Sequence, residues 1–466
     1  MDEMTPVWFT RPRPAPRARL TRPASYDVVV VGAGITGLTT ALLMARGGRS
    51  VAVLEGRRIG DGTTGHTTGK VSLLQGTKLS RVLSSNPPSV ARDYVEANRE
   101  GQAWLRRYCE EHGVPVEERA ATTYATTRLG ELRARAELRA ARVAGLDVEW
   151  AEELELPYDI RGAVTLQGQL QVDAMQVLSA LLEGVEAEGG EVFEETRVLT
   201  AEKEGDRVAV ELESGAKVSA GHVVLATSQP ILDRGAFFAR LKAQRSYGAT
   251  LAGSWVPTAM HLSSDPQVRS LRSVQSGDGE TLLMIGGSGH GTGRGNPSDR
   301  LEKLLAWGQQ HFPGSTVRHT WSAQDHSPVT SLPYVGPLVP GERRIHVATG
   351  FDKWGMSNAP AAALLLAATV LGGTPPAWGR AMKSWTPREV LGAGRAALFN
   401  GEVGVQMVCG YAAKPFRKDD APICSHLGGV LSWNGAEKSW DCPLHGSRFG
   451  PDGSVLEGPA TRPVKV

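Results

Sequence analysis

The sequence has few cysteines, almost no net charge and no long apolar run. Its 466 residues include four cysteines, too few for a small secreted domain built on disulfides. Lys and Arg number 51 against 49 Asp and Glu, so the net charge of +2 gives no sign of a nucleic-acid partner. The longest mostly apolar run, residues 359–371, is too short to cross a bilayer. We therefore expect a cytoplasmic protein with no nucleic-acid and no membrane partner.

The first residues also lack the apolar stretch of an export signal. Residues 11–23 read RPRPAPRARLTRP, a composition rich in Arg and Pro. This composition predicts a disordered basic leader over residues 1–24. An arm that contacts an acidic partner is the alternative.

A strand, a glycine turn and a helix follow one another near the N-terminus. Residues 26–31 form a β-branched run typical of a buried parallel strand, and they lead into the turn Gly32-Ala-Gly34-Ile-Thr-Gly37. The glycines allow a tight turn and close approach of a pyrophosphate, whose charge the next helix N-terminus stabilises. A second strand, residues 50–54, ends at Glu55, where an acid can bind ribose hydroxyls. This order of features predicts a dinucleotide site, and the Glu55 carboxylate would repel a 2′-phosphate.

Further segments resemble the D-amino-acid oxidase superfamily of FAD enzymes, which includes glycine oxidase, sarcosine oxidase and dimethylglycine dehydrogenase. Residues 60–70 resemble its second flavin-contact loop, and residues 348–357 resemble its C-terminal flavin-binding turn and helix start. The resemblance spans roughly residues 25–390 and implies FAD as the cofactor. With the glycine turn, it implies these cofactor-binding residues: Gly32, Gly34, Ile35, Thr36, Gly37, Glu55, Gly62, Thr63, Thr64, His66, Thr67, Thr68, Val198, Thr227, Gly350, Phe351, Trp354, Gly355, Met356 and Ser357.

His66 raises a separate question about how FAD is held. In dimethylglycine and sarcosine dehydrogenases a histidine at the matching place is bonded covalently to the flavin 8α-methyl group. The resemblance therefore suggests a covalent bond between His66 and FAD. A free histidine packed beside the flavin ring, or one that contacts a phosphate, is the alternative.

Two short motifs near the C-terminus carry metal ligands. Cys424-Ser-His426 and Cys442-Pro-Leu-His445 stand fifteen residues apart. Two thiolates and two imidazoles suit a tetrahedral zinc ion, or a Rieske [2Fe-2S] cluster with both histidines on one iron.

The residues around these motifs favour the cluster. Gly428-Gly429 and Gly446-Ser447 can offer backbone N–H groups to bridging sulfides, and residues 458–460 resemble the proline loop of Rieske proteins. Respiratory Rieske proteins carry two further, disulfide-bonded cysteines, whose places here hold Gly429 and Leu444. We therefore expect a cluster without a supporting disulfide.

Together the motifs predict an α/β (α+β) fold in three domains. A Rossmann-like FAD-binding domain is expected to be discontinuous, with an inserted mixed-sheet substrate domain and a small all-β Rieske domain after it. In the Rieske domain, residues 404–409 are expected to form a strand that buries Cys409. The expected boundaries are 25–80, 165–235 and 330–390 for the FAD domain, 81–164 and 236–329 for the substrate domain, and 395–466 for the Rieske domain.

Substrate contacts are weakly marked in the sequence. Tyr247 and His290 are our catalytic candidates in the substrate sheet, and Asp325 and His326 are similar cases. The glycine-rich residues 286–293 are expected to form a flexible loop on the substrate side. No pair stands out as an acid–base couple, and amine oxidation by hydride transfer scarcely needs one.

These observations predict an FAD-dependent oxidoreductase acting on a small amine or amino-acid-like substrate. Electrons would pass from FAD to the Rieske cluster and leave at its histidine-bearing end for an acceptor, either a protein or O2. Three alternatives remain open: an O2-using oxidase or biosynthetic enzyme with a structural or sensing cluster, a reductase component for a partner oxygenase, and a non-enzymatic redox sensor.

Overall fold

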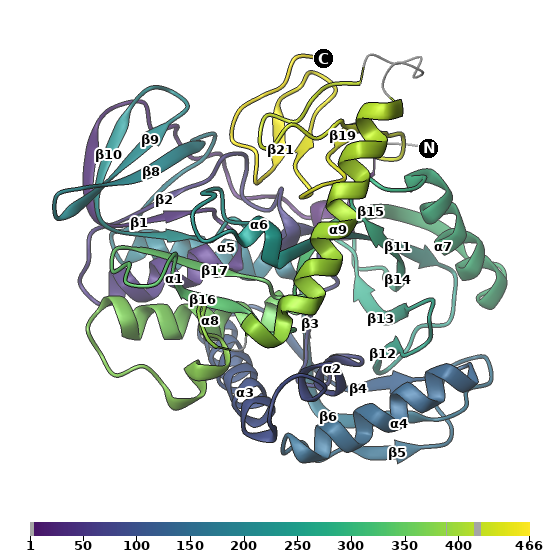
Figure 1. Cartoon of the computed structure of the whole chain (residues 1–466). Coiled ribbons are helices and arrows are strands. Elements are labelled where there is room, and N and C mark those ends of the chain that lie inside the picture. Colours follow the sequence, from purple (N-terminus) through teal and green to yellow (C-terminus); the bar gives the residue numbers. More distant parts are fainter. Residues whose placement is uncertain (1–3, 388, 414–420) are drawn as a thin grey trace.

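Three β-sheets organise the chain (Figure 1). A computed structural model describes residues 4–387, 389–413 and 421–466. Two large sheets make up the body, and a small C-terminal sheet, yellow in Figure 1, rests on both. The predicted α/β fold with a small all-β domain at its C-terminus is confirmed.

The first sheet is the Rossmann-like sheet predicted from the glycine turn. Its central strand, β1, pairs in parallel with β2 on one side and with β10 on the other. Alternate residues of β1 and β2 belong to two separate cores on opposite faces, as expected for a parallel sheet buried on both sides. The sheet runs β16-β17-β10-β1-β2-β7, with β8 and β9 joined to β10. Its strands are β1 (Ala24–Val31), β2 (Val51–Leu54), β7 (Glu191–Phe193), β8 (Val198–Glu204), β9 (Arg207–Leu212), β10 (Lys217–Leu225), β16 (Tyr334–Pro337) and β17 (Ile345–Thr349).

Helices cover one face of this sheet, and the antiparallel strands β8 and β9 cover the other. The covering helices share a core of apolar residues with the face of β1 that carries Val28 and Val30. They are α1 (Ile35–Arg46), α3 (Pro88–Glu111), α5 (Ala174–Ala187) and α8 (Gly355–Val370), and the short η3 (Ala377–Ala381) follows α8.

The second sheet is mixed, as predicted for the substrate domain. It runs β15-β11-β14-β13-β12-β4-β6-β3, with β5 paired to β6, and β12 runs parallel to β4. Its strands are β3 (Lys70–Val71), β4 (Val116–Tyr124), β5 (Glu149–Ala151), β6 (Ala163–Val172), β11 (Leu241–Ala252), β12 (Met260–Ser263), β13 (Arg269–Gln275), β14 (Thr281–Gly291) and β15 (Thr316–Pro328). The helices around it are α2 (Lys78–Leu83), α4 (Arg128–Val143) and α7 (Pro297–His311). The short α6 (Phe237–Arg240) leads from β10 into β11, and its Phe237 packs in the core that β8 and β9 cover.

Two expectations for this sheet need correction. Strands β3 and β6 pair within the second sheet, although residues 70–71 and 165–172 were expected in the FAD domain. Strand β14 extends to Gly291, so most of residues 286–293 are sheet and not a flexible loop. Cross-strand pairing with β11 as far as Gly291 accounts for this order.

The expectation of a disordered leader is wrong for residues 4–24. Val7 and Trp8 of η1 (Val7–Thr10) are buried, and Trp8 Nε1 donates to the Thr67 carbonyl at 2.7 Å. Arginines of this segment form ion pairs with the body of the protein, at 3.1 Å for Arg11 and Asp173 and at 2.7 Å for Arg13 and Asp61. Composition indicated disorder, whereas these individual contacts hold the segment in place.

The C-terminal part begins with a long helix. Residues 404–409 lie in α9 (Glu389–Ala413) and Cys409 is exposed, so the predicted strand with a buried thiol is wrong. The small antiparallel sheet follows, and across the described ranges no helix is both long and apolar enough to cross a membrane. Its strands, in order, are β18 (Ser432–Asn434), β19 (Ser439–Asp441), β20 (Arg448–Phe449) and β21 (Val455–Glu457).

Candidate functional site

The glycine turn between β1 and α1 has the geometry of a dinucleotide site. A Cβ atom on Gly37 would lie 1.8 Å from the carbonyl oxygen of Gly32, so only glycine allows this close packing of helix and strand. The Glu55 carboxylate accepts from the N–H groups of Ala33 and Arg57 at 2.8 and 2.9 Å. Helix α1 starts after Gly34, where the Ile35 N–H donates to Thr64 Oγ1 at 3.3 Å, and its first residues line the cavity, so the positive end of the helix dipole favours an anion there.

A large cavity opens at this turn. It is bounded by the turn, by the loop after residue 60, by the ends of β10 and β15, and by the start of α8. Because these segments come from distant parts of the chain, the fold brings together most of the residues predicted to bind FAD. Those that line the cavity are Gly32, Gly34, Ile35, Thr36, Glu55, Gly62, Thr63, Thr64, Thr67, Val198, Thr227, Gly350, Phe351, Gly355 and Met356.

Five predicted cofactor residues do not line this cavity: Gly37, His66, Thr68, Trp354 and Ser357. Gly37 contributes by letting helix α1 pack closely against the turn at Gly32. The Ser357 hydroxyl donates to the side chain of buried Asn98 at 2.7 Å. His66 Nδ1 lies 2.9 Å from the Gly62 carbonyl oxygen, and burial lowers the pKa of its imidazole. The covalent bond between His66 and FAD stays a prediction.

The catalytic candidates Tyr247 and His290 meet, but away from the cavity. The Tyr247 hydroxyl lies 3.1 Å from His290 Nε2 across strands β11 and β14, and the two rings are stacked. Neither side chain is among those that line the cavity. Their contact is explained by strand pairing, and the structure does not bring them to the expected flavin position.

Asp325 and His326, at the end of β15, do line the cavity. Both side chains are buried, and Asp325 Oδ2 and His326 Nε2 have no hydrogen-bond partner. Burial raises the pKa of Asp325 to about 6 and lowers the pKa of His326 to about 4. These two unpartnered atoms are therefore available to a bound cofactor or substrate.

The turn before α8 is held by a buried ion pair that sequence reasoning missed. The Asp352 carboxylate lies 2.8 Å from Lys78 Nζ and 3.0 Å from Arg81 Nη2, and the Lys78 side chain is fully buried. Asp352 and Lys353 both adopt left-handed backbone conformations and line the cavity. The ion pair therefore fixes a strained turn at the cavity wall.

The four predicted metal ligands come together in two matching loops. The Cys424 N–H donates to the Gly429 carbonyl, and the Cys442 N–H donates to the Ser447 carbonyl, both at 2.8 Å. The two thiols lie close to each other, and their contact lowers the pKa of Cys424 and raises that of Cys442. The rings of His426 and His445 face each other edge-on, 5.4 Å apart.

This arrangement fits a two-iron cluster better than one zinc ion. In the ranges that the structure describes, no three His, Cys, Asp or Glu side chains gather around one point, as a mononuclear site requires. Instead the thiols pair with each other and the imidazoles with each other, which suits one iron per pair. His426 Nδ1 is buried without a partner, as expected for an atom that faces a metal. All four cysteines are free, and Gly429 and Leu444 stand where respiratory Rieske proteins have their disulfide.

The histidine-bearing end of the loops lies against the segment that connects β10 to β11. His426 and His445 side chains are only 6% and 5% exposed. Phe238 of α6 packs edge-on against both rings, with centroid distances of 5.9 and 5.2 Å. Phe238 thus shields the two rings, and the exit of electrons at this end stays a prediction.

The C-terminal domain also forms part of the cavity wall. Leu456, Glu457, Gly458, Ala460 and Thr461 line the same cavity as the glycine turn. In addition, Nη2 of Arg197, a further lining residue, donates to the Val455 carbonyl at 2.8 Å. The cysteine–histidine loops and the predicted flavin cavity thus belong to one continuous structure.

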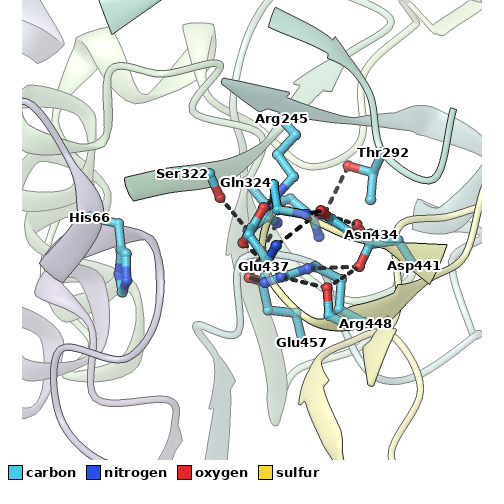
Figure 2. Close-up of polar contacts among 12 residues, drawn as sticks. His66, Arg245, Thr292, Ser322, Gln324, Asn434, Glu437, Asp441, Arg448 and Glu457 are labelled. Carbon is cyan, nitrogen blue, oxygen red and sulfur yellow. Dashed lines mark hydrogen bonds and ion pairs between the residues drawn. The ribbon is translucent and has the colours of Figure 1, made fainter. Parts of the chain in front are cut away.

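An interface network made of two buried arginines, Arg245 and Arg448, and two partly buried glutamates, Glu437 and Glu457, stabilises this arrangement (Figure 2). Arg245 reaches from β11 to Glu437, and Arg448 lies 2.8 Å from Glu437 and 2.7 Å from Glu457. Burial alone would raise the pKa of Glu457, but Arg448 and Arg245 hold it at about 2. In Figure 2, His66 lies apart from this network.

Backbone packing supports the same interface. Gly293, which follows β14 with a left-handed φ of 69°, would place a Cβ 2.6 Å from the backbone nitrogen of Pro443. Arg294 next to it donates to the Pro443 carbonyl at 3.1 Å. These contacts bring the second sheet against the Cys442 loop. Sequence reasoning missed them because they join segments about 150 residues apart.

Comparison with known proteins agrees with both sites. Residues 27–369 match the family described as FAD dependent oxidoreductase, and residues 421–466 match the Rieske [2Fe-2S] domain. The Rieske 2Fe-2S iron-sulfur protein YhfW of Bacillus subtilis is 30% identical, with 94% of this chain and 92% of that protein covered. Cytochrome b6-f complex iron-sulfur subunit 1 of Synechocystis is 54% identical over 43 residues, 9% of this chain and 24% of that protein. Glycine oxidase from Geobacillus kaustophilus shares the fold, with a TM-score of 0.63 at 21% identity over 75% of this chain and 96% of that one.

Proposed function

The chain belongs to the FAD-dependent oxidoreductase family and ends in a Rieske [2Fe-2S] domain, and we propose that it oxidises an amine or amino-acid-like substrate and passes the electrons from FAD to the cluster. FAD supplies a two-electron acceptor for hydride, and the cluster supplies a one-electron carrier. A final acceptor, protein or O2, and a cytoplasmic location complete the proposal. The free thiols of all four cysteines suit a reducing compartment.

One observation carries the proposal: the Rieske domain is part of the wall of the flavin cavity. Residues 456–461 contribute to that wall, and Phe238 of the flavin side packs on both iron-ligating histidines. The interface network, with its buried Arg245 and Arg448, joins the Rieske domain to the second sheet. Two sites in one continuous structure favour electron exchange inside one chain.

The chain's own residues suit binding and orientation of a flavin. Helix α8 begins without a side-chain cap at Trp354, and Gly355 and Met356 line the cavity, so the helix N-terminus favours negative charge there. Asp325 offers an unpartnered carboxylate oxygen that can accept a hydrogen bond from a substrate amine. The printed name of the glycine oxidase neighbour supports an amino-acid or amine substrate as part of this proposal.

Replacing Cys442 by serine tests the path directly. We expect anaerobic reduction of the flavin by an amine or amino-acid panel to remain, while transfer to a one-electron acceptor slows, because one iron loses a thiolate ligand. Cys409→Ser, which alters an exposed thiol on α9, is the matched control. Equal transfer rates in Cys442→Ser and the parent would contradict the proposal, and fast reoxidation by air in both would support the oxidase alternative.

A further inference from the structure

A carboxylate of the flavin side contacts one of the iron-ligating histidines. Asp233 Oδ1 lies 2.6 Å from His426 Nε2. The Asp233 side chain is 57% exposed, whereas the imidazole that it contacts is 6% exposed. The contact thus joins an acid at the surface to a ring that is almost completely enclosed.

Asp233 belongs to a segment that touches both sites. Residues 226–236 connect β10 to α6, and Thr227, Ser228 and Ile231 in that segment line the flavin cavity. Phe238 follows directly and packs on both imidazoles. A single stretch of chain therefore spans from the cavity to the histidine-bearing end of the cluster loops.

The two nitrogens of His426 have different surroundings. Nδ1 is buried without any partner, so it is the atom free to bind iron. Nε2 then carries the proton and donates it in the hydrogen bond to Asp233. Metal-binding histidines commonly donate their other N–H to a carboxylate, which fixes the ring and makes the ligand more basic.

The negative charge has a predictable effect on the cluster. A carboxylate hydrogen-bonded to a ligand stabilises the oxidised cluster, which carries one more positive charge than the reduced form. A more basic, well-oriented His426 imidazole also stabilises the oxidised cluster relative to the reduced one. Both effects lower the reduction potential of the cluster.

We propose that Asp233 is a positioning residue for the Rieske cluster, which holds His426 against the flavin side of the protein and lowers the reduction potential of the cluster. The proposal rests on the Rieske domain and on this contact. It does not depend on the identity of the substrate or on the direction of electron flow.

The test is the midpoint potential of the cluster in full-length Asp233→Asn, from a redox titration followed by electron paramagnetic resonance. Asparagine can still accept from Nε2 but carries no charge. We expect the equilibrium between oxidised and reduced cluster to shift about tenfold towards the reduced form, a rise of 59 mV for a one-electron couple. Asp206→Asn, which removes an exposed carboxylate from the turn between β8 and β9, should leave the potential at the parent value.

A second variant separates charge from structure. Asp233→Glu keeps the charge and should stay closer to the parent potential than Asp233→Asn, with iron and sulfide content measured in each sample. An Asp233→Asn cluster at the parent potential, or equal potentials in the Asn and Glu variants, would overturn the proposal. Either result would leave transfer from flavin to cluster untouched, because that transfer is measured separately with Cys442→Ser.

Discussion

Replacing Arg245 by methionine tests whether the interface network holds the Rieske domain in place. The Arg245 side chain is 2% exposed, with Nε 2.5 Å from Glu437 and Nη2 2.6 Å from the Ser322 hydroxyl. Methionine keeps much of the apolar part of the arginine side chain but removes its positive charge. Glu437 and Glu457 then keep Arg448 as their main cationic partner.

The cost can be bounded from these contacts. Removing one partner of a buried ion pair costs about 3–5 kcal/mol. Because Arg448 still lies within 2.8 Å of Glu437 and 2.7 Å of Glu457, we expect the lower end of that range, about 3 kcal/mol. At about 1.4 kcal/mol per factor of ten, docking of the Rieske domain weakens roughly a hundredfold.

Urea titration measures this effect with two signals. Circular dichroism of the cluster reports on the Rieske domain, and flavin fluorescence reports on the FAD site. We expect the cluster signal of Arg245→Met to be lost at clearly lower urea than in the parent. Arg318→Met, which changes an arginine that is 53% exposed and 3.7 Å from Glu280, should behave as the parent does. Superimposable curves for Arg245→Met and the parent would refute the reasoning.

Three further predictions follow from the same structure. Gly37→Ala should yield protein without bound FAD, measured by absorbance, because the added Cβ would meet the Gly32 carbonyl oxygen at 1.8 Å; FAD bound as in the parent would contradict this packing argument. Burial raises the pKa of Asp325 to about 6, so its carboxylate becomes charged above that pH and affinity for an amine substrate should rise through pH 6. Asp325→Asn should flatten this pH profile of affinity. An unchanged profile would exclude Asp325 as the group that binds the amine. Arginine contacts lower the pKa values of Glu437 and Glu457 in the folded protein, that of Glu457 to about 2, so these contacts stabilise docking above the unfolded pKa of about 4.3. This stabilisation is lost as the pH falls through the folded pKa values, and cluster circular dichroism that does not change with acid from about pH 4.3 to about pH 2 would contradict the argument.

Both cofactor sites could be predicted from sequence because each depends on local motifs. The turn from Gly32 to Gly37 needs glycine for packing between neighbouring elements, and Cys424, His426, Cys442 and His445 lie on two short loops. In each case the residue type and the spacing along the chain already determine the chemistry.

What joins the two sites could not be predicted in this way. Asp233 and Arg245 are ordinary charged residues in the sequence, and their roles arise only when distant segments pack together. The same limit explains two errors. The Arg-rich N-terminus is ordered by individual acids such as Asp173, and the apolar residues 404–409 continue the helix α9. Composition alone does not contain those contacts.

Transfer of electrons inside one chain is the central claim, and anaerobic stopped-flow mixing with a reducing substrate tests it most directly. We predict that the flavin band bleaches first and that cluster reduction follows at a rate that does not change when the protein is diluted tenfold. A cluster that stays oxidised after the flavin has bleached, or a rate that falls in proportion to protein concentration, would contradict the account.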